Sequence, residues 1–278
     1  MNVAEALAQA QARLSGVSDT AMLDSQVLLA HLLQKRRPWI LAHPEGDFSP
    51  HLEQELASTL SRLENGLPLP YLLGHWEFFG LDFSLTPDVL IPRPETEMLV
   101  ETALAWLKDH PASTLATDIG TGCGCIAISL AVKAPNLHLL ATDISLPALK
   151  LACQNARKHA VAQRIDFIQG DLLPPVPRQI NLVCANLPYI PSDVLPTLKT
   201  YSQEPISALD GGAGGLEIIR RLLALLSGRL SRGGLALLEI GSDQGKIGLS
   251  LAQAAFPAAQ IQVLPDLAGL DRLLVIQT

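Results

Sequence analysis

Residues 1–65 carry apolar side chains at the three- and four-residue spacing of amphipathic helices. The clearest series are Leu23, Val27, Leu28 and Leu32, followed by Leu52, Leu56, Leu60 and Leu63. Ser18-Asp19 and Ser49-Pro50 have the residue types that begin helices, and residues 43–46 have the types that separate them. We therefore expect a small helical bundle in this part of the chain.

Residues 66–86 show a different pattern, in which proline and glycine alternate with aromatic residues. The residues concerned are Pro68, Pro70, Tyr71, Gly74, Trp76, Phe78, Phe79, Gly80 and Phe83. Such a segment favours turns and short strands, so we predict a hairpin linker. Residues 95–106 return to helical spacing, with acidic residues at the start, where a helix N-terminus favours them.

From Leu115 onward, short apolar runs alternate with helical stretches. The runs are 115–119, 137–141, 165–168, 180–185 and 235–240. This alternation predicts an α/β domain over residues 87–278, with a parallel sheet covered by helices on both faces. Ligands of such sheets bind beyond the carboxyl ends of the strands, near the switch in strand order.

Composition narrows the class of protein. A chain of 278 residues with 48% hydrophobic and 17% charged residues suits two globular domains. No apolar run reaches the roughly 20 residues of a membrane helix, and no signal peptide is evident, so we expect a cytoplasmic protein. The net charge of −7 disfavours a large phosphate-binding surface, and we interpret Lys35-Arg36-Arg37 as a solvated helix end.

The four cysteines are Cys123, Cys125, Cys153 and Cys184. Cys123 and Cys125 are close enough in sequence to suggest a metal pair, but no His or Cys group with zinc-like spacing accompanies them. We therefore expect small buried side chains and no metal.

A glycine-rich loop, Asp118-Ile119-Gly120-Thr121-Gly122-Cys123-Gly124, follows the first apolar run and leads into a helix. Glycines let the backbone approach a ligand closely, and the helix N-terminus offers free amides. The spacing is G-x-G-x-G, whereas dinucleotide-binding loops have G-x-G-x-x-G. Together with the acid directly upstream, this spacing favours a cationic or amino-bearing ligand over NAD, with Asp118, Thr121 and Cys123 among its contacts.

Two further acids end neighbouring strands. Asp143 follows the second run, where a carboxylate can accept both hydroxyls of a ribose, and Asp171 follows the third, where it could meet an adenine amino group. Each acid alone is more often a helix cap or a surface charge. With Asp118, however, three acids stand at three strand ends, and this arrangement favours a ligand site.

The stretch Asn186-Leu187-Pro188-Tyr189 follows the fourth run. A planar amino group has two hydrogens, and the Asn186 side-chain oxygen can accept one of them. The Leu187 carbonyl can accept the other, because Pro188 biases Leu187 to an extended conformation. Tyr189 can lie against the flat face of the substrate group. The alternative is an ordinary Asn-x-Pro turn.

These residues resemble the S-adenosylmethionine-dependent methyltransferases of the Rossmann-like class. The resemblance implies a mostly parallel seven-stranded sheet and S-adenosylmethionine as cofactor, with Asn186 near it. It places Gly120, Gly122 and Gly124 at the methionine part, Asp143 at the ribose, and Asp171 with Leu172 at the adenine.

Further segments, in order, resemble one family, the release factor glutamine methyltransferases, also called HemK or PrmC. They are residues 71–80, 90–97, 204–205, 208–212, 238–241, 244–245 and 266–269. The resemblance implies that residues 1–65 dock a peptide chain release factor and that residues 87–278 methylate the glutamine of its Gly-Gly-Gln loop. It also implies that Pro94, Glu95 and Thr96 border the substrate pocket. We expect a monomer.

Leu187 stands where the family has the first proline of its tetrapeptide, and Leu270 where it often has arginine. Two other functions stay open. One is a nucleic-acid adenine methyltransferase, which uses a near-identical tetrapeptide but which the acidic charge disfavours. The other is a cofactor-binding adaptor without catalysis, which the two departures from the family pattern suggest.

Overall fold

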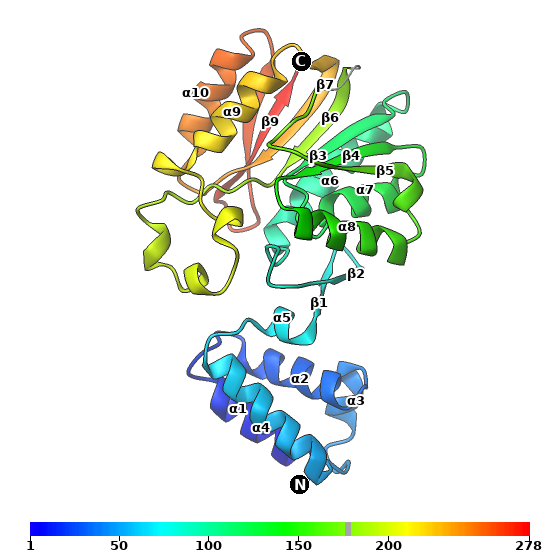
Figure 1. The fold of residues 1–278 in the computed structure, drawn as a ribbon, viewed down its shortest axis with the longest axis vertical. Helices are drawn as coiled ribbons and strands as arrows, with labels where there is room; N and C mark the ends of the chain where they lie inside the picture. Colours follow the sequence, from blue (N-terminus) through cyan, green and yellow to red (C-terminus); the bar gives the residue numbers. More distant parts are fainter. Residues whose placement is uncertain (176–178) are drawn as a thin grey trace. The chain divides into compact units, whose positions relative to one another are not determined.

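The computed structural model describes residues 1–175 and 179–278 and divides the chain into two compact units, Met1–His75 and Trp76–Thr278. The first unit is helical, and the second is an α/β domain (Figure 1). The division falls inside the segment 66–86 that the sequence pattern marks as a linker. The domain limits expected from the sequence stay predictions.

The first unit is a bundle of short helices. They are α1 (Val3–Leu14), α2 (Ala21–Leu32), α3 (Arg37–Ala42), α4 (Pro50–Glu64) and α5 (Leu69–Leu73). Asn2 caps α1 by accepting a hydrogen bond from the Glu5 amide, while the Glu5 side chain accepts one from the Asn2 amide. Ser49 caps α4 at the predicted start, whereas α2 begins slightly later than Ser18-Asp19 suggested.

A two-stranded hairpin follows the bundle. Its strands are β1 (His75–Phe78) and β2 (Leu81–Ser84). The turn residues Phe79 and Gly80 have φ angles of +53° and +73°, the geometry of a type I′ turn, whose twist matches that of the strands. The sequence pattern indicates this hairpin but not the short helix α5 before it.

The second unit is built on a seven-stranded sheet with the order β5-β4-β3-β6-β7-β9-β8 (Figure 1). The strands are β3 (Leu115–Ile119), β4 (His138–Asp143), β5 (Ile165–Gln169), β6 (Ile180–Ala185), β7 (Leu230–Glu239), β8 (Gln260–Pro265) and β9 (Asp271–Gln277). Strand β9 runs antiparallel to both of its neighbours, β7 and β8, and the pairings from β5 to β7 are parallel. The strand order reverses at β3, which lies between β4 and β6, so a ligand site is expected there.

Helices cover both faces of this sheet. They are α6 (Glu97–Asp109), α7 (Cys125–Lys133) and α8 (Leu146–Lys158) on one face, and α9 (Glu217–Leu226) and α10 (Gly245–Ala255) on the other. Within β6, Leu182 and Cys184 join the core beneath α6 and α7, while Val183 and Ala185 join the core beneath α9 and α10. Burial on both faces explains why this strand is a continuous apolar run. The predicted α/β fold with a mostly parallel sheet is confirmed.

Short 3₁₀ turns connect these elements. They are η1 (Pro94–Thr96), η2 (Ala162–Arg164), η3 (Leu195–Thr197), η4 (Lys199–Ser202), η5 (Ile206–Ala208) and η6 (Ala213–Gly215). The turn η1 leads directly into α6, so the predicted helix over residues 95–106 begins two residues later, at Glu97. In the parts of the chain that the structure describes, no helix has the length and apolar character to cross a bilayer.

Candidate active site

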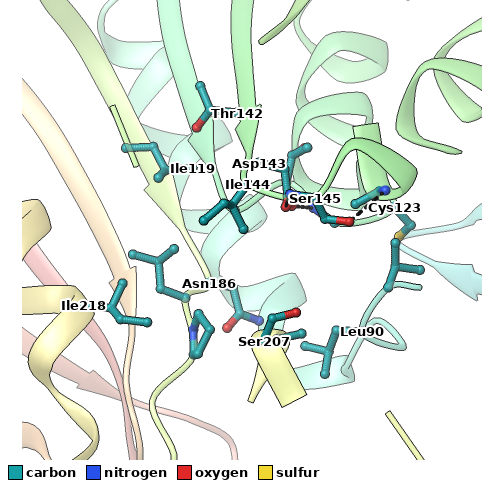
Figure 2. Close-up of a pocket in the computed structure, with 18 of the residues that line it drawn as sticks. Leu90, Ile119, Cys123, Thr142, Asp143, Ile144, Ser145, Asn186, Ser207 and Ile218 are labelled. Carbon is teal, nitrogen blue, oxygen red and sulfur yellow. Dashed lines mark hydrogen bonds between the residues drawn. The ribbon is translucent and has the colours of Figure 1, made fainter. Parts of the chain in front are cut away.

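A cavity of about 530 Å³ opens at the carboxyl ends of β3, β4, β5 and β6 (Figure 2). Residues that directly follow or end these strands form its wall, among them Gly120, Asp143, Asp171 and Asn186. The strand ends are in register, since Ile119 pairs with residues of both β4 and β6. The volume is in the range of small-molecule sites, and the position is the one that the sequence pattern predicts.

The glycine loop crosses the end of β3 in a conformation that depends on glycine. The amides of Gly120 and Thr121 both donate to the Thr142 carbonyl, each at 2.9 Å. Gly120 has a φ of +73°, and a Cβ there would lie 2.9 Å from Cδ2 of Leu187. Gly124 has a φ of +87°, which also favours glycine. The loop therefore brings its backbone against the cavity.

Asp118 supports this loop from behind. Its Oδ2 atom accepts hydrogen bonds from the Thr121 hydroxyl at 2.6 Å and the Ala127 amide at 3.1 Å. Its Oδ1 atom has no hydrogen-bond partner among the described residues, and burial raises the pKa of the carboxyl to about 6. The side chain is fully buried and lies outside the cavity wall, in contrast to the expected ligand contact.

Asp143 does line the cavity, at the end of β4. One carboxylate oxygen accepts from the Gly122 amide at 2.9 Å and the other from the Ser145 amide at 2.8 Å. A carboxylate has about four acceptor positions, so two protein donors leave room for ligand hydroxyls. The two bonds also fix the glycine loop to the start of α8, which Ser145 caps.

Asp171 and Leu172 line the cavity beyond β5. The Asp171 carboxylate forms an ion pair with Arg221 of α9, and both side chains are more than half exposed. Leu172 has a φ of +61°, and its carbonyl accepts from the Thr142 hydroxyl at 2.9 Å. The sequence pattern identified the two wall residues but not Arg221, which engages the carboxylate that we expected to meet adenine.

The tetrapeptide after β6 extends the same wall. Asn186, Leu187 and Pro188 line the cavity, together with Cys123 of the glycine loop. The Asn186 side-chain Nδ2 donates to the Thr96 hydroxyl at 2.9 Å. The glycine loop and the tetrapeptide therefore face one space, as their positions at neighbouring strand ends predict.

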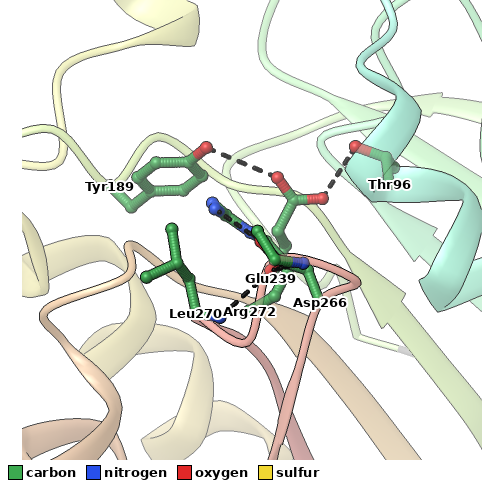
Figure 3. Close-up of polar contacts among 7 residues, drawn as sticks. Thr96, Tyr189, Glu239, Asp266, Leu270 and Arg272 are labelled. Carbon is green, nitrogen blue, oxygen red and sulfur yellow. Dashed lines mark hydrogen bonds and ion pairs between the residues drawn. The ribbon is translucent and has the colours of Figure 1, made fainter.

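Tyr189 turns away from this wall toward Glu239 (Figure 3). Its hydroxyl donates to Oε1 of Glu239 at 3.4 Å, and burial raises the pKa of the phenol to about 12. Its carbonyl accepts from the Gln244 side chain at 2.8 Å, whose oxygen accepts from the Gly241 amide. These contacts fix both ends of Tyr189, although its ring does not line the cavity.

The glycine cluster 211–215 packs as a turn on this tetrapeptide. A Cβ on Gly215 would lie 2.2 Å from the Tyr189 carbonyl oxygen, and one on Gly211 would lie 2.8 Å from the Pro188 carbonyl oxygen. The Ile190 carbonyl accepts from the Gly211 amide at 2.8 Å. Close packing against the backbone therefore explains the glycines.

Pro94 and Glu95 are exposed and lie outside the cavity wall, so the expected border with substrate is not seen at these positions. The next residue, Thr96, is buried and does line the cavity. Its hydroxyl donates to Oε2 of Glu239 at 2.7 Å. Burial raises the pKa of Glu239 to about 7. This buried carboxylate accepts hydrogen bonds from both Thr96 and Tyr189 (Figure 3).

Two buried polar residues, Glu204 and Asn155, support the cavity, although the sequence pattern assigned neither of them a role. Glu204 accepts from the Ile91 amide at 3.0 Å and pairs with Arg93, which ties the wall segment Ile206–Ala208 to the chain before η1. Asn155 of α8 links the hairpin to the glycine loop through hydrogen bonds to the backbones of Ser84 and Cys123. An asparagine on the apolar face of a helix was the available clue for the latter.

Asp266 and Arg272 form a partly buried ion pair of 3.1 Å beside Glu239 (Figure 3). The Asp266 carboxylate also accepts from the backbone amides of Ala268 and Leu270. This loop therefore depends on the backbone amide of Leu270. The hydrogen bond is independent of the Leu270 side chain, which stands where the family often has arginine. Among the described residues, no cluster of His, Cys, Asp or Glu is arranged to hold a metal.

Comparison with solved structures supports the fold. The N-terminal domain of human METTL16, solved in complex with S-adenosylhomocysteine, matches with a TM-score of 0.50. It is 19% identical in sequence and covers 71% of this chain and 76% of that one. At this identity the match shows the shared methyltransferase fold alone.

Family models and sequence relatives go further. Residues 5–74 match the PrmC N-terminal domain, and residues 95–195 match the methyltransferase small domain. The release factor glutamine methyltransferase of Moorella thermoacetica is 44% identical over 98% of this chain and 97% of its own length. That of Coxiella burnetii is 38% identical over 99% and 98%, respectively. The chain belongs to the release factor glutamine methyltransferase family.

Proposed function

We propose that this chain transfers the methyl group of S-adenosylmethionine to the side-chain amide nitrogen of the glutamine in the Gly-Gly-Gln loop of peptide chain release factors. The observation that carries the proposal is that Asn186 and the glycine loop line one cavity. The family of the chain supports the substrate class, because its relatives are named for release factor glutamine methylation.

The cavity residues fit the cofactor. The backbone of Gly120 and Gly122 can approach its methionine part, since both glycines line the cavity and have no side chain of their own. Asp143 has acceptor positions left for the ribose hydroxyls, and Leu172 offers an apolar wall for the adenine. When bound, S-adenosylmethionine supplies an electrophilic methyl carbon on a sulfonium. We also propose that Asp171 contacts the adenine, with a carboxylate that it shares between the adenine and Arg221.

The tetrapeptide supplies the positioning. An amide nitrogen is a poor nucleophile, so holding it at the right place and shifting electron density onto it are the main contributions open to the protein. In our proposal the Asn186 oxygen and the Leu187 carbonyl accept its two hydrogens, with Pro188 restricting the backbone. As the nitrogen gains the methyl carbon, the carbon–sulfur bond breaks and the nitrogen releases one proton to solvent.

Residues 1–65 are proposed to dock the release factor. Three large apolar side chains of this unit, Met22, Leu23 and Leu41, are 59%, 41% and 55% exposed, as a protein-binding surface would require. We also propose that the enzyme acts as a monomer in the cytoplasm. The net charge of −7 supports binding of a protein substrate without direct contact to nucleic acid.

A labelled-methyl transfer assay tests the function. Purified protein, S-adenosylmethionine labelled on its methyl group and an unmethylated release factor are combined, with a release factor variant carrying Ala for the loop glutamine as control. We expect label on the natural factor and none on the variant or on nucleic acid. Label on nucleic acid would support an adenine methyltransferase, and cofactor binding without any transfer would support an adaptor.

A further inference from the structure

The side-chain amide of Asn186 could face the cavity with either its oxygen or its nitrogen, and only the oxygen can accept a hydrogen from a substrate amide. The shape of the group does not decide between the two, so its hydrogen bonds must. The Nδ2 atom of Asn186 donates to Oγ1 of Thr96 at 2.9 Å. Thr96 is 1% exposed and lines the same cavity.

The Thr96 hydroxyl has a single proton, and a second contact determines its direction. Oγ1 of Thr96 lies 2.7 Å from Oε2 of Glu239, at the end of β7. An ionised carboxylate can only accept, so the Thr96 proton points to Glu239. The Thr96 oxygen is then left as an acceptor toward Asn186. It selects the NH₂ end of the amide and leaves the Asn186 oxygen for substrate.

The surroundings of Glu239 suit the ionised form in this arrangement. The Tyr189 hydroxyl donates to its other oxygen at 3.4 Å, and the positive charge of Arg272 favours the carboxylate (Figure 3). Arg272 is itself held by Asp266 at 3.1 Å. Burial and the nearby charge of Glu95 act in the opposite direction. Glu239 is thus a buried acceptor of two hydrogen bonds.

We propose that Thr96 and Glu239 are positioning residues that hold the Asn186 amide with its oxygen toward the substrate, and that protonation of Glu239 reverses this orientation. A protonated Glu239 can donate to Thr96, whose proton then turns toward Asn186 and favours the amide oxygen on that side. The NH₂ group would face the substrate NH₂, and the acceptor would be lost. This inference rests on the proposed function.

The chain of hydrogen bonds from Glu239 through Thr96 to Asn186, called the relay below, gives the reaction a pH dependence. Burial raises the pKa of Glu239 to about 7, although Arg272 opposes the effect. The fraction of enzyme with an ionised Glu239 therefore rises with pH through this value. We expect kcat to be constant above it and to fall by about tenfold per pH unit well below it. Replacing the carboxyl by an amide in Glu239→Gln should remove this acidic limb, and a limb that persists would contradict the proposal.

Two variants at one buried position test the orientation. Thr96→Val keeps the volume but removes the hydroxyl, whereas Thr96→Ser keeps the hydroxyl. We expect Thr96→Val to lower kcat on the release factor by at least ~tenfold, the usual effect of losing a supporting hydrogen bond in a site. The Kd for S-adenosylmethionine should change little, and Thr96→Ser should recover most of kcat. A Thr96→Val enzyme as active as the wild type would overturn the relay.

A second measurement keeps the inference separate from the proposed function. Hydrogen exchange of the Asn186 side-chain NH₂, followed by NMR without substrate, reports the contact with Thr96 directly. We expect slow exchange in the wild type and in Thr96→Ser, and faster exchange in Thr96→Val. Equal exchange in all three would overturn the relay even if the release factor is methylated. An inactive wild type that shows the expected exchange would count against the substrate alone.

Discussion

The Cδ2 atom of Leu187 lies 2.9 Å from the position that a Cβ on Gly120 would occupy. Leu187 is 5% exposed and stands where related motifs have proline, so this side chain fills the wall between the tetrapeptide and the glycine loop. The two motifs are packed directly against each other. Placement of the proposed substrate acceptors therefore depends on the backbone of the glycine loop.

Gly120→Ala should be more damaging than Gly122→Ala. Both glycines have positive φ, +73° and +55°, which costs a non-glycine residue about 1–2 kcal/mol. A Cβ on Gly120 also meets Leu187, whereas one on Gly122 meets nothing within 4 Å. We expect the lower Tm for Gly120→Ala, and a Gly120→Ala/Leu187→Ala double variant that loses less than the sum of the single losses. Equal Tm values for the two glycine variants would contradict the packing argument.

Asp118 should make stability depend on pH. Its pKa is raised from 3.8 to about 6, so the folded protein binds a proton more tightly than the unfolded chain. The free energy of unfolding of the wild type should then fall as pH rises from about 4 to about 6, by about 3 kcal/mol at most. Asp118→Asn keeps an acceptor for Thr121 but cannot ionise. Urea unfolding across this pH range should show that the free energy of unfolding of Asp118→Asn, relative to the wild type, rises with pH and then levels off. Parallel plots of unfolding free energy against pH for the two proteins would contradict the raised pKa of Asp118.

Asn155 should be a stability residue that acts on the loop. Its Nδ2 atom donates to the carbonyls of Cys123 at 2.9 Å and Ser84 at 3.1 Å, and its oxygen accepts from the Ser84 amide at 2.9 Å. Asn155→Ala leaves the buried Cys123 carbonyl and the partly buried Ser84 groups without this partner, so we expect a loss of about 1–3 kcal/mol in urea unfolding. The exposed Gln163→Ala serves as control. Comparable small losses in both variants would show that the hydrogen bonds of Asn155 are unimportant for stability.

Asn186→Ala should separate turnover from cofactor binding. The Asn186 side chain is proposed to contact the substrate nitrogen, so its removal should lower kcat by about 10²-fold or more while the Kd for S-adenosylmethionine changes little. Asn181→Ala is the matched control, because Asn181 begins the same strand and bonds to Leu115 and Ser231 away from the cavity. Kinetics with calorimetric titration of the cofactor measure both quantities. Equal losses in kcat and affinity would argue against the role.

The sequence predicted the strands β3 to β7 well and the last two strands, β8 and β9, poorly. The spans of β3 and β6 agree with the apolar runs, because strands buried on both faces appear as continuous hydrophobic segments. The apolar pattern did not indicate β8, whose residues are half-buried or exposed, and β9 was likewise missed, although the family resemblance implied seven strands. Helix α5 is only a few residues long and contains Pro70, so helical periodicity had too little length to show.

For the site, too, the sequence predicted some features and not others. Gly120, Asp143 and Asn186 could be brought together from sequence, because the carboxyl ends of neighbouring parallel strands meet at one edge. The direction of the Asp118 side chain could not, since a strand residue near the end faces either the core or the ligand. The bond from Thr96 to Glu239 spans 143 residues and depends on how α6 packs on the sheet. No local pattern reports such a contact.

The most direct test of the account is to map the methyl group. Purified protein is incubated with S-adenosylmethionine and an unmethylated bacterial release factor, and the product is analysed by peptide fragmentation in a mass spectrometer. We expect one added methyl on the side chain of the Gly-Gly-Gln glutamine. A methyl group on another residue, or no transfer by protein shown separately to bind the cofactor, would contradict it.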